Sequence, residues 1–482
     1  MTRLLHALAT TCSLAALLVS LPAAPAFAQP AAAELDAVVT AAFVPDQPGG
    51  AVLVVKDGKV LFRKAIGMAS MELGVPLQPD TIFRLGSITK QFTAAAIMML
   101  VEEGKVSLTD PVEKYVPGYP TQGHVITVEH LLTHTSGIQS YTDIPGWFPG
   151  RIRADMAVLD LVDAFKKEPM QFAPGTRYAY NNSAYVLLGA IIEKAAGTTY
   201  EQFLTTRIFT PLGMTRTFYG SNEPIIRGRA QGYTRDDGVV KNSQFLSMTQ
   251  PYAAGSLVST LDDLARWDAA LYTDRVVKAE SLARMWTPYL LKDGSSTRYG
   301  YGFQVGDMRG QQAIEHGGGI PGFSTYALRL PQEHVYVVVL CNSDNPRVAP
   351  GYLARRLAAM AIGKPFPERT AITVESSVLA RYVGTYSNDA RDVRRTVTVE
   401  GSRIYLQRGG RPKVEIKAAS ATEFFLENSL TFVRFDVSAD GKDATLLYYG
   451  DGSDTPERSR RISDTAPSAA PATTGPAGQR QP

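Results

Sequence analysis

Cysteine is scarce in this sequence, with two in 482 residues. Cys12 lies in an N-terminal segment that has the pattern of a cleavable signal, so the mature chain keeps Cys341 alone and can form no internal disulfide. Cys341 closes the continuous apolar run 335–341, which is typical of a buried strand. We therefore expect its thiol to be a small packed side chain and not a nucleophile.

An excess of charge of either sign is also missing. Lys and Arg number 49 and Asp and Glu number 46, which leaves a formal net charge of +3. Such a surface offers no broad cationic area for a phosphate backbone, so we expect no nucleic-acid partner. The remaining composition, 45% hydrophobic and 20% charged, is that of an ordinary globular protein. Its length predicts two or three domains, roughly, and no repeat of fixed period is present.

No apolar run reaches the ~20 residues that cross a membrane as a helix. Residues 1–28 instead have the pattern of a secretory signal, with a weakly positive start, a short apolar stretch at 14–21 and a small-residue cleavage site at Ala26–Ala28. A membrane anchor is the alternative interpretation, and the shortness of the apolar stretch disfavours it. We expect a periplasmic or secreted protein that keeps no transmembrane anchor after cleavage.

Strand and helix patterns mix over residues 34–365. Residues 50–62 predict a β-hairpin, an amphipathic helix is expected over about 87–103, and two late strands are expected over 324–330 and 335–341. Helices that lie between the early and late strands of one sheet imply an α/β layered core.

Residues 375–463 contain almost only short strand patterns separated by turn residues, which predicts a small all-β barrel or meander. Prolines make 364–368 the natural linker. The expected divisions of the chain are a signal at 1–28, an α/β domain at 29–365, a β domain at 370–463 and a disordered Ala/Pro-rich tail at 464–482.

Ser87 and Lys90 form the one S-x-x-K motif of the sequence, at the start of the predicted helix. Residues three apart share a helix face, so the two side chains can touch. A serine becomes a nucleophile when a neighbour takes its proton, and a lysine can do this when burial and the helix dipole lower its pKa. The alternative is a helix N-cap serine followed by an exposed lysine.

Tyr180 and Asn182 follow a turn at 174–177 and precede the helical run 185–192. A tyrosine before a helix can take part in proton transfer when an ammonium lies near its phenol. Asn182 could hold both the lysine and a substrate carbonyl or amide. Taken singly, the pair is also explained by a core tyrosine and a capping asparagine.

A glycine-rich segment at 315–324 precedes the late strands and contains His316, Gly317, Gly318 and Gly319. Glycines let a substrate approach the backbone closely, and a free N–H there could complete an oxyanion hole with the N–H of Ser87. Read alone, the segment is a glycine-rich loop with a surface histidine. It lacks the pattern of a phosphate-binding loop.

Motifs of other hydrolases and of metal sites are missing. The sequence has no G-x-S-x-G, which disfavours an α/β-hydrolase. His130 and His134 have the i, i+4 spacing of a zinc pair but lack the glutamate of H-E-x-x-H. We expect no metal and no cofactor.

Taken in order, the segments at Ser87, Tyr180 and His316 resemble the serine β-lactamase and penicillin-binding superfamily. The resemblance is to its class C-like branch, with D-alanyl-D-alanine carboxypeptidases, D-aminopeptidases and family VIII esterases. It extends over about residues 45–345, and the segment that begins at Tyr382 is less specifically similar to a lipocalin-like module. The fold that it implies is a β-lactamase/transpeptidase-like antiparallel sheet flanked by helices, α/β (α+β) in class, followed by a small β-barrel.

The resemblance also implies a role for each motif residue. Ser87 would be the acylated nucleophile, Lys90 its proton partner, Tyr180 the base and later the acid, and Asn182 a group that positions the substrate. Gly319 would donate the second N–H of the oxyanion hole, beside that of Ser87.

His316 counts among the catalytic residues, and Gly317 and Gly318 would form a substrate loop. Enzymes of this branch that hydrolyse β-lactams carry a lysine where His316 stands. A histidine is mostly neutral near pH 7, so it suits a peptidase or an esterase better than a dedicated β-lactamase.

We therefore expect an exported serine hydrolase that forms an acyl-enzyme on Ser87 and cleaves an amide or ester, in a D-amino-acid peptide or a small ester. A class C-like β-lactamase and a non-catalytic penicillin-binding-like protein of the cell wall are the alternatives. The expected partner is a small-molecule or peptide substrate, and the sequence leaves the oligomeric state open.

Overall fold

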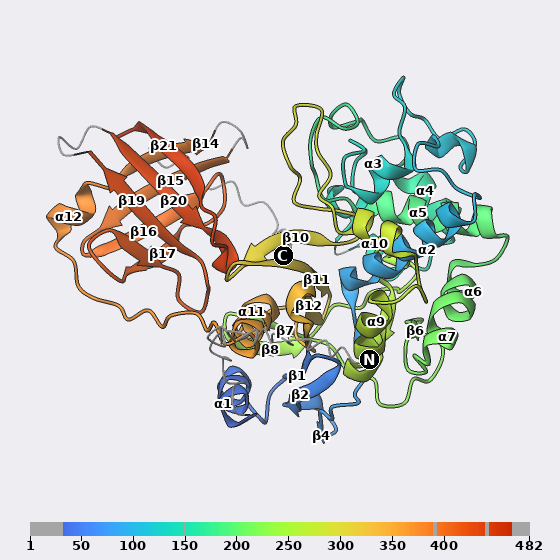
Figure 1. Ribbon diagram of the computed structural model, residues 1–482, viewed down its shortest axis with the longest axis horizontal. Coiled ribbons are helices and arrows are strands. Elements are labelled where there is room, and N and C mark those ends of the chain that lie inside the picture. Colours follow the sequence, from blue (N-terminus) through green and yellow to red (C-terminus); the bar gives the residue numbers. More distant parts are fainter. Residues whose placement is uncertain (1–31, 149, 389–392, 439–442, 465–482) are drawn as a thin grey trace, which may run out of the picture.

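The computed structural model describes residues 32–148, 150–388, 393–438 and 443–464. The predicted signal at 1–28 and all but the first residue of the predicted tail lie outside these ranges. An α/β part and a β-barrel lie side by side (Figure 1). Within the described ranges, no helix combines the length and the apolar character that crossing a membrane requires.

Six antiparallel strands form the central sheet. In spatial order they are β10 (Gln304–Met308), β11 (Gln311–Ile320), β12 (Phe323–Leu330), β13 (Val335–Cys341), β1 (Gly50–Lys56) and β2 (Lys59–Ile66). The middle strands β1 and β13 are rich in valine, whose branched side chain suits a pleated surface packed on both faces. The predicted hairpin and the late strands are confirmed.

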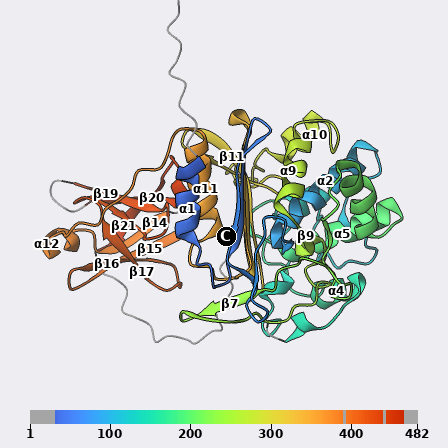
Figure 2. The ribbon, with the colours of Figure 1, turned by 90° about the horizontal axis from the view of Figure 1, so that it is seen from below.

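Helices cover both faces of this sheet, as Figure 2 shows with the sheet seen edge-on. Val52 and Val54 pack on the face that carries α1 (Ala32–Ala42) and α11 (Pro350–Ala361). The alternate residues of β1 belong to the opposite cluster, with α2 (Thr89–Glu102) and α9 (Leu261–Leu271). The expected α/β layered core, an antiparallel sheet flanked by helices, is therefore confirmed.

Cys341 is fully buried on the face of the sheet that carries α1 and α11, and this burial raises the pKa of its thiol to about 12.

Helix α2 is the central helix of the α/β part, and its residues from Thr89 to Leu100 are all buried. Gly104, where the sequence predicts its end, has a φ of 71°. The other helices are α3 (Val128–Leu132), α4 (Val158–Phe165), α5 (Asn182–Ala196), α6 (Tyr200–Leu204), α7 (Thr210–Leu212), α8 (Tyr252–Gly255) and α10 (Ala279–Met285).

Helix α5 contains the run at 185–192 that the sequence predicts as helical. The side chain of Asn181 accepts a hydrogen bond from the N–H of Ala184 and so caps its first turn, and Gly197 ends it in the left-handed conformation, with a φ of 69°.

Short elements connect these helices and strands. They are η1 (Gly86–Ile88), η2 (Val112–Lys114), η3 (Tyr141–Asp143), η4 (Arg151–Arg153), the π-helical turn η5 (Thr205–Phe209), η6 (Pro331–Glu333), β3 (Met68–Ser70), β4 (Val75–Pro76), β5 (Phe83–Arg84), β6 (Phe218–Tyr219), β7 (Tyr233–Asp236), β8 (Val239–Asn242) and β9 (Leu257–Ser259).

The glycine-rich segment is a strand, which corrects the expectation of a loop. Gly317 and Gly318, predicted as a substrate loop, lie inside β11 and pair with Tyr326 and Thr325 of β12. His316 is fully buried and not at the surface. Glycines have no side chain to alternate between the two faces, so the sequence carries no period-two signal there.

The C-terminal part is a closed barrel of eight antiparallel strands, which decides between the predicted barrel and meander. Its strands are β14 (Gly384–Asn388), β15 (Val393–Glu400), β16 (Arg403–Arg408), β17 (Val414–Ala418), β18 (Glu423–Phe425), β19 (Phe432–Val437), β20 (Ala444–Tyr449) and β21 (Glu457–Ser463), and β14 pairs with β21 to close the ring. Apolar side chains fill its interior. Two short helices, α12 (Ser376–Ala380) and η8 (Gly450–Gly452), accompany it.

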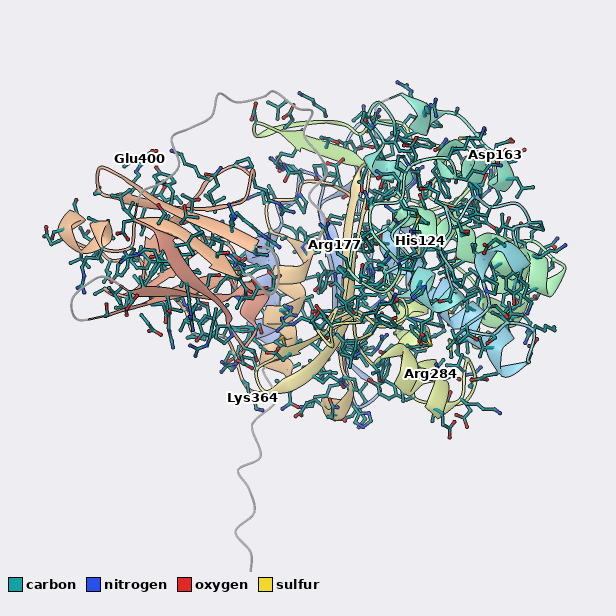
Figure 3. The ribbon with its side chains drawn as sticks, turned by 90° about the horizontal axis from the view of Figure 1, so that it is seen from above. His124, Asp163, Arg177, Arg284, Lys364 and Glu400 are labelled. Carbon is teal, nitrogen blue, oxygen red and sulfur yellow. The ribbon has the colours of Figure 1, made fainter. Side chains whose placement is uncertain are left out.

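Hydrogen bonds join the barrel to the α/β part beside η8. Arg355 of α11 donates from Nη1 to the carbonyl oxygen of Asp451 at 2.8 Å. Ser453 donates to the carboxylate of Asp307, which also accepts from the backbone N–H of Asp454 at 2.8 Å. Figure 3 labels Lys364 between the two parts, at the start of the predicted linker. The barrel therefore rests against the α11 side of the sheet.

Candidate active site

Ser87 lies in the short helical turn η1, between strand β5 and the buried helix α2. Gly86 begins this turn with a φ of 57°, a conformation that glycine adopts without strain. Lys90, one turn further on, is fully buried, whereas Ser87 is partly exposed. The Nζ of Lys90 lies 3.1 Å from the Oγ of Ser87. The two residues of the S-x-x-K motif are therefore in contact.

Two further oxygens lie within hydrogen-bond distance of the Lys90 amine. Nζ donates to Oδ1 of Asn182 at 2.8 Å and to the carbonyl oxygen of Ala254 at 2.9 Å. Both partners can only accept. A neutral amine has two N–H groups and one lone pair, so donation to Asn182 and Ala254 leaves the lone pair for the Ser87 hydroxyl. This arrangement is suited to removing the Ser87 proton.

Burial favours the uncharged form of Lys90. It lowers the pKa of the amine well below its usual value, because the ammonium would lose its hydration. No carboxylate forms an ion pair with Lys90 among the described residues. Burial has the opposite effect on Tyr180 and raises the pKa of its phenol well above the usual value. Burial therefore favours the uncharged form of both groups.

The phenol of Tyr180 lies beside these groups. Its hydroxyl is buried and has no hydrogen-bond partner within the described chain. The Lys90 nitrogen is 4.7 Å from the centre of the Tyr180 ring. The ring also contacts His134, with 4.4 Å between ring centres, and Nδ1 of His134 accepts a hydrogen bond from the backbone N–H of Asn181. His134 thus holds the segment that carries Tyr180 and Asn182.

Strand β11 directs the N–H of Gly319 toward this site. The chain turns at 321–322, so Ile320 and Phe323 form the hydrogen-bonded pair that closes the hairpin. Hydrogen-bonded and non-hydrogen-bonded residue pairs alternate along antiparallel strands, so the next pair, Gly319 and Ser324, is not hydrogen-bonded. The N–H of Gly319 therefore points away from β12. On the other side, β10 pairs with β11 only as far as Glu315. The Gly319 N–H therefore faces the free edge of the sheet.

Close backbone packing brings Ser87 to the same edge. A Cβ on Gly86 would lie 3.0 Å from the nitrogen of Gly319, and one on Gly318 would lie 2.0 Å from the carbonyl oxygen of Leu85. The N–H of Ser87 belongs to the first turn of a helix and has no intrahelical acceptor. The N–H groups of Ser87 and Gly319 are therefore both available, as an oxyanion hole requires.

His316 is buried behind the site and does not offer a charge to a substrate. Its Nδ1 lies 2.6 Å from the carbonyl oxygen of Gly317, which can only accept, so Nδ1 carries the proton. Its Nε2 then accepts from the hydroxyl of Tyr299, at 2.8 Å. Burial, together with Lys90, lowers the pKa of His316 to about 3. The ring is neutral, and both of its nitrogens are engaged within the protein.

The cleft beside Ser87 is small, with a volume of about 50 Å³. Tyr141, Thr142, Phe148 and Ile152 form one wall, and they come from the long connection that precedes α4. Its other lining residues are Gly86, Ser87, Asn182, Leu246, Gln250, Pro251, Ala254, Gly255, Gly319, Ile320 and Pro321. None of the described residues that line this cleft carries a charge. The cleft thus suits an uncharged group next to the scissile bond.

The described residues contain no cluster of three His, Cys, Asp or Glu side chains placed to hold a metal ion. His130 lies in α3, where its Nδ1 accepts from the backbone of Thr127. His134 lies beyond the end of this helix, with a φ of 59°, so the two histidines do not share a helix face.

Residues 36–361 match the family described as Beta-lactamase, which covers more than half of the chain. The chain belongs to the β-lactamase family. Its relatives include Penicillin-binding protein 4* of Bacillus subtilis (strain 168), 32% identical over 432 residues, which are 85% of this chain and 94% of that protein. The D-aminopeptidase of Gluconobacter oxydans is 30% identical over 336 residues, which cover 67% of this chain and 61% of that protein.

Among solved structures, the chain is similar to the octameric penicillin-binding protein homologue from Pyrococcus abyssi. The two share 29% sequence identity with a TM-score of 0.63, over 89% of this chain and 99% of that one. The chain is a serine hydrolase of the β-lactamase family. A closed barrel fits the expected C-terminal module.

The structure brings Ser87, Lys90, Asn182 and Gly319 together as the sequence predicts, and it adds contacts that the sequence does not predict. Ala254 accepts from Lys90, His134 supports Tyr180, and Tyr299 donates to His316. All three lie within residues 36–361, which match the family. A family match indicates such segments but does not reveal which atoms make contact.

The lowered pKa of Lys90 predicts how the stability of this β-lactamase-family chain depends on pH. Between the folded value and the unfolded value of about 10.4, the unfolded chain binds one more proton, so stability rises with pH by up to about 1.4 kcal/mol per unit. Lys90→Met lacks this contribution. The free energy of unfolding of the wild type minus that of Lys90→Met should therefore increase from about pH 8 to about pH 9.5, by at most about 2 kcal/mol.

Urea denaturation of both proteins at the two pH values measures this difference. Lys59→Met, at an exposed lysine, is the matched control. A difference between wild type and Lys90→Met that does not change with pH would mean that Lys90 keeps its proton in the folded protein.

Proposed function

We propose that this chain is an exported serine hydrolase that forms an acyl-enzyme on Ser87 and cleaves an amide or ester bond. The observation that carries the proposal is the position of the buried Lys90 amine, whose nitrogen lies 3.1 Å from the Ser87 hydroxyl and 2.8 and 2.9 Å from two oxygens that can only accept hydrogen bonds. Export rests on the signal pattern of residues 1–28.

In acylation, Ser87 Oγ bonds to the substrate carbonyl carbon while its proton passes to the neutral amine of Lys90. The carbonyl oxygen becomes negative and accepts hydrogen bonds from the N–H groups of Ser87 and Gly319. Tyr180 is protonated, because burial raises its pKa, so it is suited to give its proton to the leaving nitrogen or oxygen. The bond between the carbonyl carbon and the leaving atom breaks as Tyr180 gives this proton. The Lys90 ammonium then returns a proton to Tyr180.

Deacylation uses the same groups with water in place of the leaving group. Water bonds to the acyl carbon and gives a proton to Lys90, and the bond from the acyl carbon to Ser87 Oγ breaks as Lys90 returns the proton to Ser87. This scheme assigns the first proton transfer to Lys90 and not to Tyr180, because the phenol is the less easily ionised of the two. Asn182 orients Lys90 through its Oδ1.

The proposed substrate is a D-amino-acid peptide or a small ester whose reacting end carries no carboxylate. A carboxylate beside the scissile bond needs a nearby positive charge. His316 is neutral with a pKa of about 3, and the described lining of the cleft has no charged side chain. The likeness to a D-aminopeptidase supports an amide substrate.

Replacement of the nucleophile tests the acyl-enzyme. Wild type and Ser87→Ala are incubated with a fluorophosphonate probe, and labelling is measured by intact-protein mass spectrometry. We expect labelling of the wild type and of the control Ser107→Ala, none of Ser87→Ala, and a loss of hydrolysis of ~10³-fold or more in Ser87→Ala and Lys90→Ala. Equal labelling of wild type and Ser87→Ala would refute the assignment of Ser87.

A substrate comparison separates the proposal from its nearest alternative. Initial rates are measured on p-nitrophenyl acetate, a D-amino-acid amide and nitrocefin, which carries a carboxylate. We expect kcat/KM for the ester or the amide to exceed that for nitrocefin by at least about tenfold. This is roughly the effect of one charge-assisted hydrogen bond, which the nitrocefin carboxylate would lack in this cleft. Preferred turnover of nitrocefin would favour a β-lactamase, and binding of all three without turnover would favour a non-catalytic binding protein.

A further inference from the structure

A second and larger cavity, of about 400 Å³, lies between the α/β part and the barrel. On the α/β side it is lined by the ends of β11 and β12 and by residues 349–352 at the start of α11. On the barrel side it is lined by residues 428–430, which precede β19, and by Asp451 of η8. Its volume is within the range of ~300–1,000 Å³ that is usual for ligand sites.

This cavity meets the catalytic cleft at Gly319, which lines both. A Cβ built on Gly319 would have no atom within 4 Å, so the absent side chain leaves open space on the cavity side of β11. Ser324, its partner on β12, also lines the cavity. A chain bound at Ser87 can therefore continue across Gly319 into the cavity without displacing a side chain at that point.

Four charged side chains line the cavity, and their balance is negative. Arg355 donates from Nε to Glu315 at 3.1 Å, and both are buried, so these two charges compensate each other. Asp344 and Asp451 remain. Neither is in an ion pair among the described residues, but one oxygen of Asp344 accepts hydrogen bonds from Thr234 and from the N–H of Gly322, and Asp451 lies near Arg355. Three carboxylates and one guanidinium leave the lining negative overall, which attracts a cationic group and repels an anionic one.

We propose that this cavity is a subsite for the part of an extended substrate distant from the scissile bond, and that it selects an ammonium-bearing side chain there. The proposal rests on the proposed hydrolase function and extends it from the uncharged cleft to the remainder of the substrate. The side chains of Tyr326 and Tyr352 supply apolar surface for the methylene stem of such a group.

Three extended substrates with one common scissile ester test this selection. They differ in one distal residue, which is lysine, acetyl-lysine or glutamate, and the short parent ester lacks the extension. We expect kcat/KM for the lysine substrate to exceed that for acetyl-lysine by about two- to fivefold, with glutamate lowest, as for exposed charge pairs. Equal values for all three would overturn the charge selection.

Two variants locate the effect in the cavity. Ala349→Trp adds bulk at an exposed lining residue, and Ala380→Trp on α12, which does not line the cavity, is the matched control. We expect Ala349→Trp to raise KM for the extended substrates about tenfold and to leave the short ester unchanged. Equal effects on short and extended substrates, or none on either, would overturn the location.

Asp451→Asn removes one charge at nearly constant shape. Asp451 has a φ of 50°, a conformation that asparagine also tolerates. We expect this variant to lose about half or more of the preference for lysine over acetyl-lysine while keeping its rate on the short ester. An unchanged preference in both Asp451→Asn and Asp344→Asn would contradict the role of these carboxylates.

Binding to Ser87→Ala separates this inference from the proposed function. Fluorescence anisotropy measures the affinity of the labelled lysine and acetyl-lysine peptides for Ser87→Ala and for Ser87→Ala combined with Ala349→Trp. Tighter binding of the lysine peptide that is lost with Ala349→Trp supports the subsite even if no substrate is turned over. Hydrolysis of the short ester with equal affinities for both peptides would refute the subsite and leave the hydrolase intact.

Discussion

One buried amine organises the catalytic part of this molecule. The Nζ of Lys90 is held between Asn182 of α5 and the carbonyl oxygen of Ala254 in α8, and the hydroxyl of Ser87 completes its surroundings. Three separate segments of the chain must therefore pack correctly before the amine can act. An ammonium at this depth would lose hydration without gaining a carboxylate from the described residues, so the fold favours the neutral base.

The remaining structure makes that burial possible. Helix α2 is buried from Thr89 to Leu100 and packs against α5, α6, α8 and α9, and this apolar packing offsets the cost of a buried polar group. Glycines at 86 and 318 let the nucleophile approach the edge of β11, where a side chain would collide with backbone. The geometry of the catalytic groups therefore depends directly on the packing of the core.

The sequence predicts the structural features that depend on a local pattern of residues. Valine-rich runs indicate β1 and β13, and the spacing of Ser87 and Lys90 predicts their contact, because both signals act within a few residues. It does not predict that 315–320 form a strand, because glycines give no alternation of apolar and polar side chains. It also does not predict that His316 is buried against Tyr299, because that contact depends on tertiary packing. The cavity beside Asp451 requires two parts of the chain to meet, which no local pattern encodes.

The most direct test of the neutral amine is the pH dependence of Ser87 acylation by an uncharged ester. Single-turnover rate constants are measured from about pH 5 to about pH 10 and corrected for spontaneous hydrolysis. A lowered pKa of Lys90 predicts a rate that is already independent of pH well below the usual lysine value of about 10.4 and that falls only on the acid side. A rate that keeps rising about tenfold per pH unit up to pH 10 would contradict the account, because Lys90 would then be protonated in the folded enzyme.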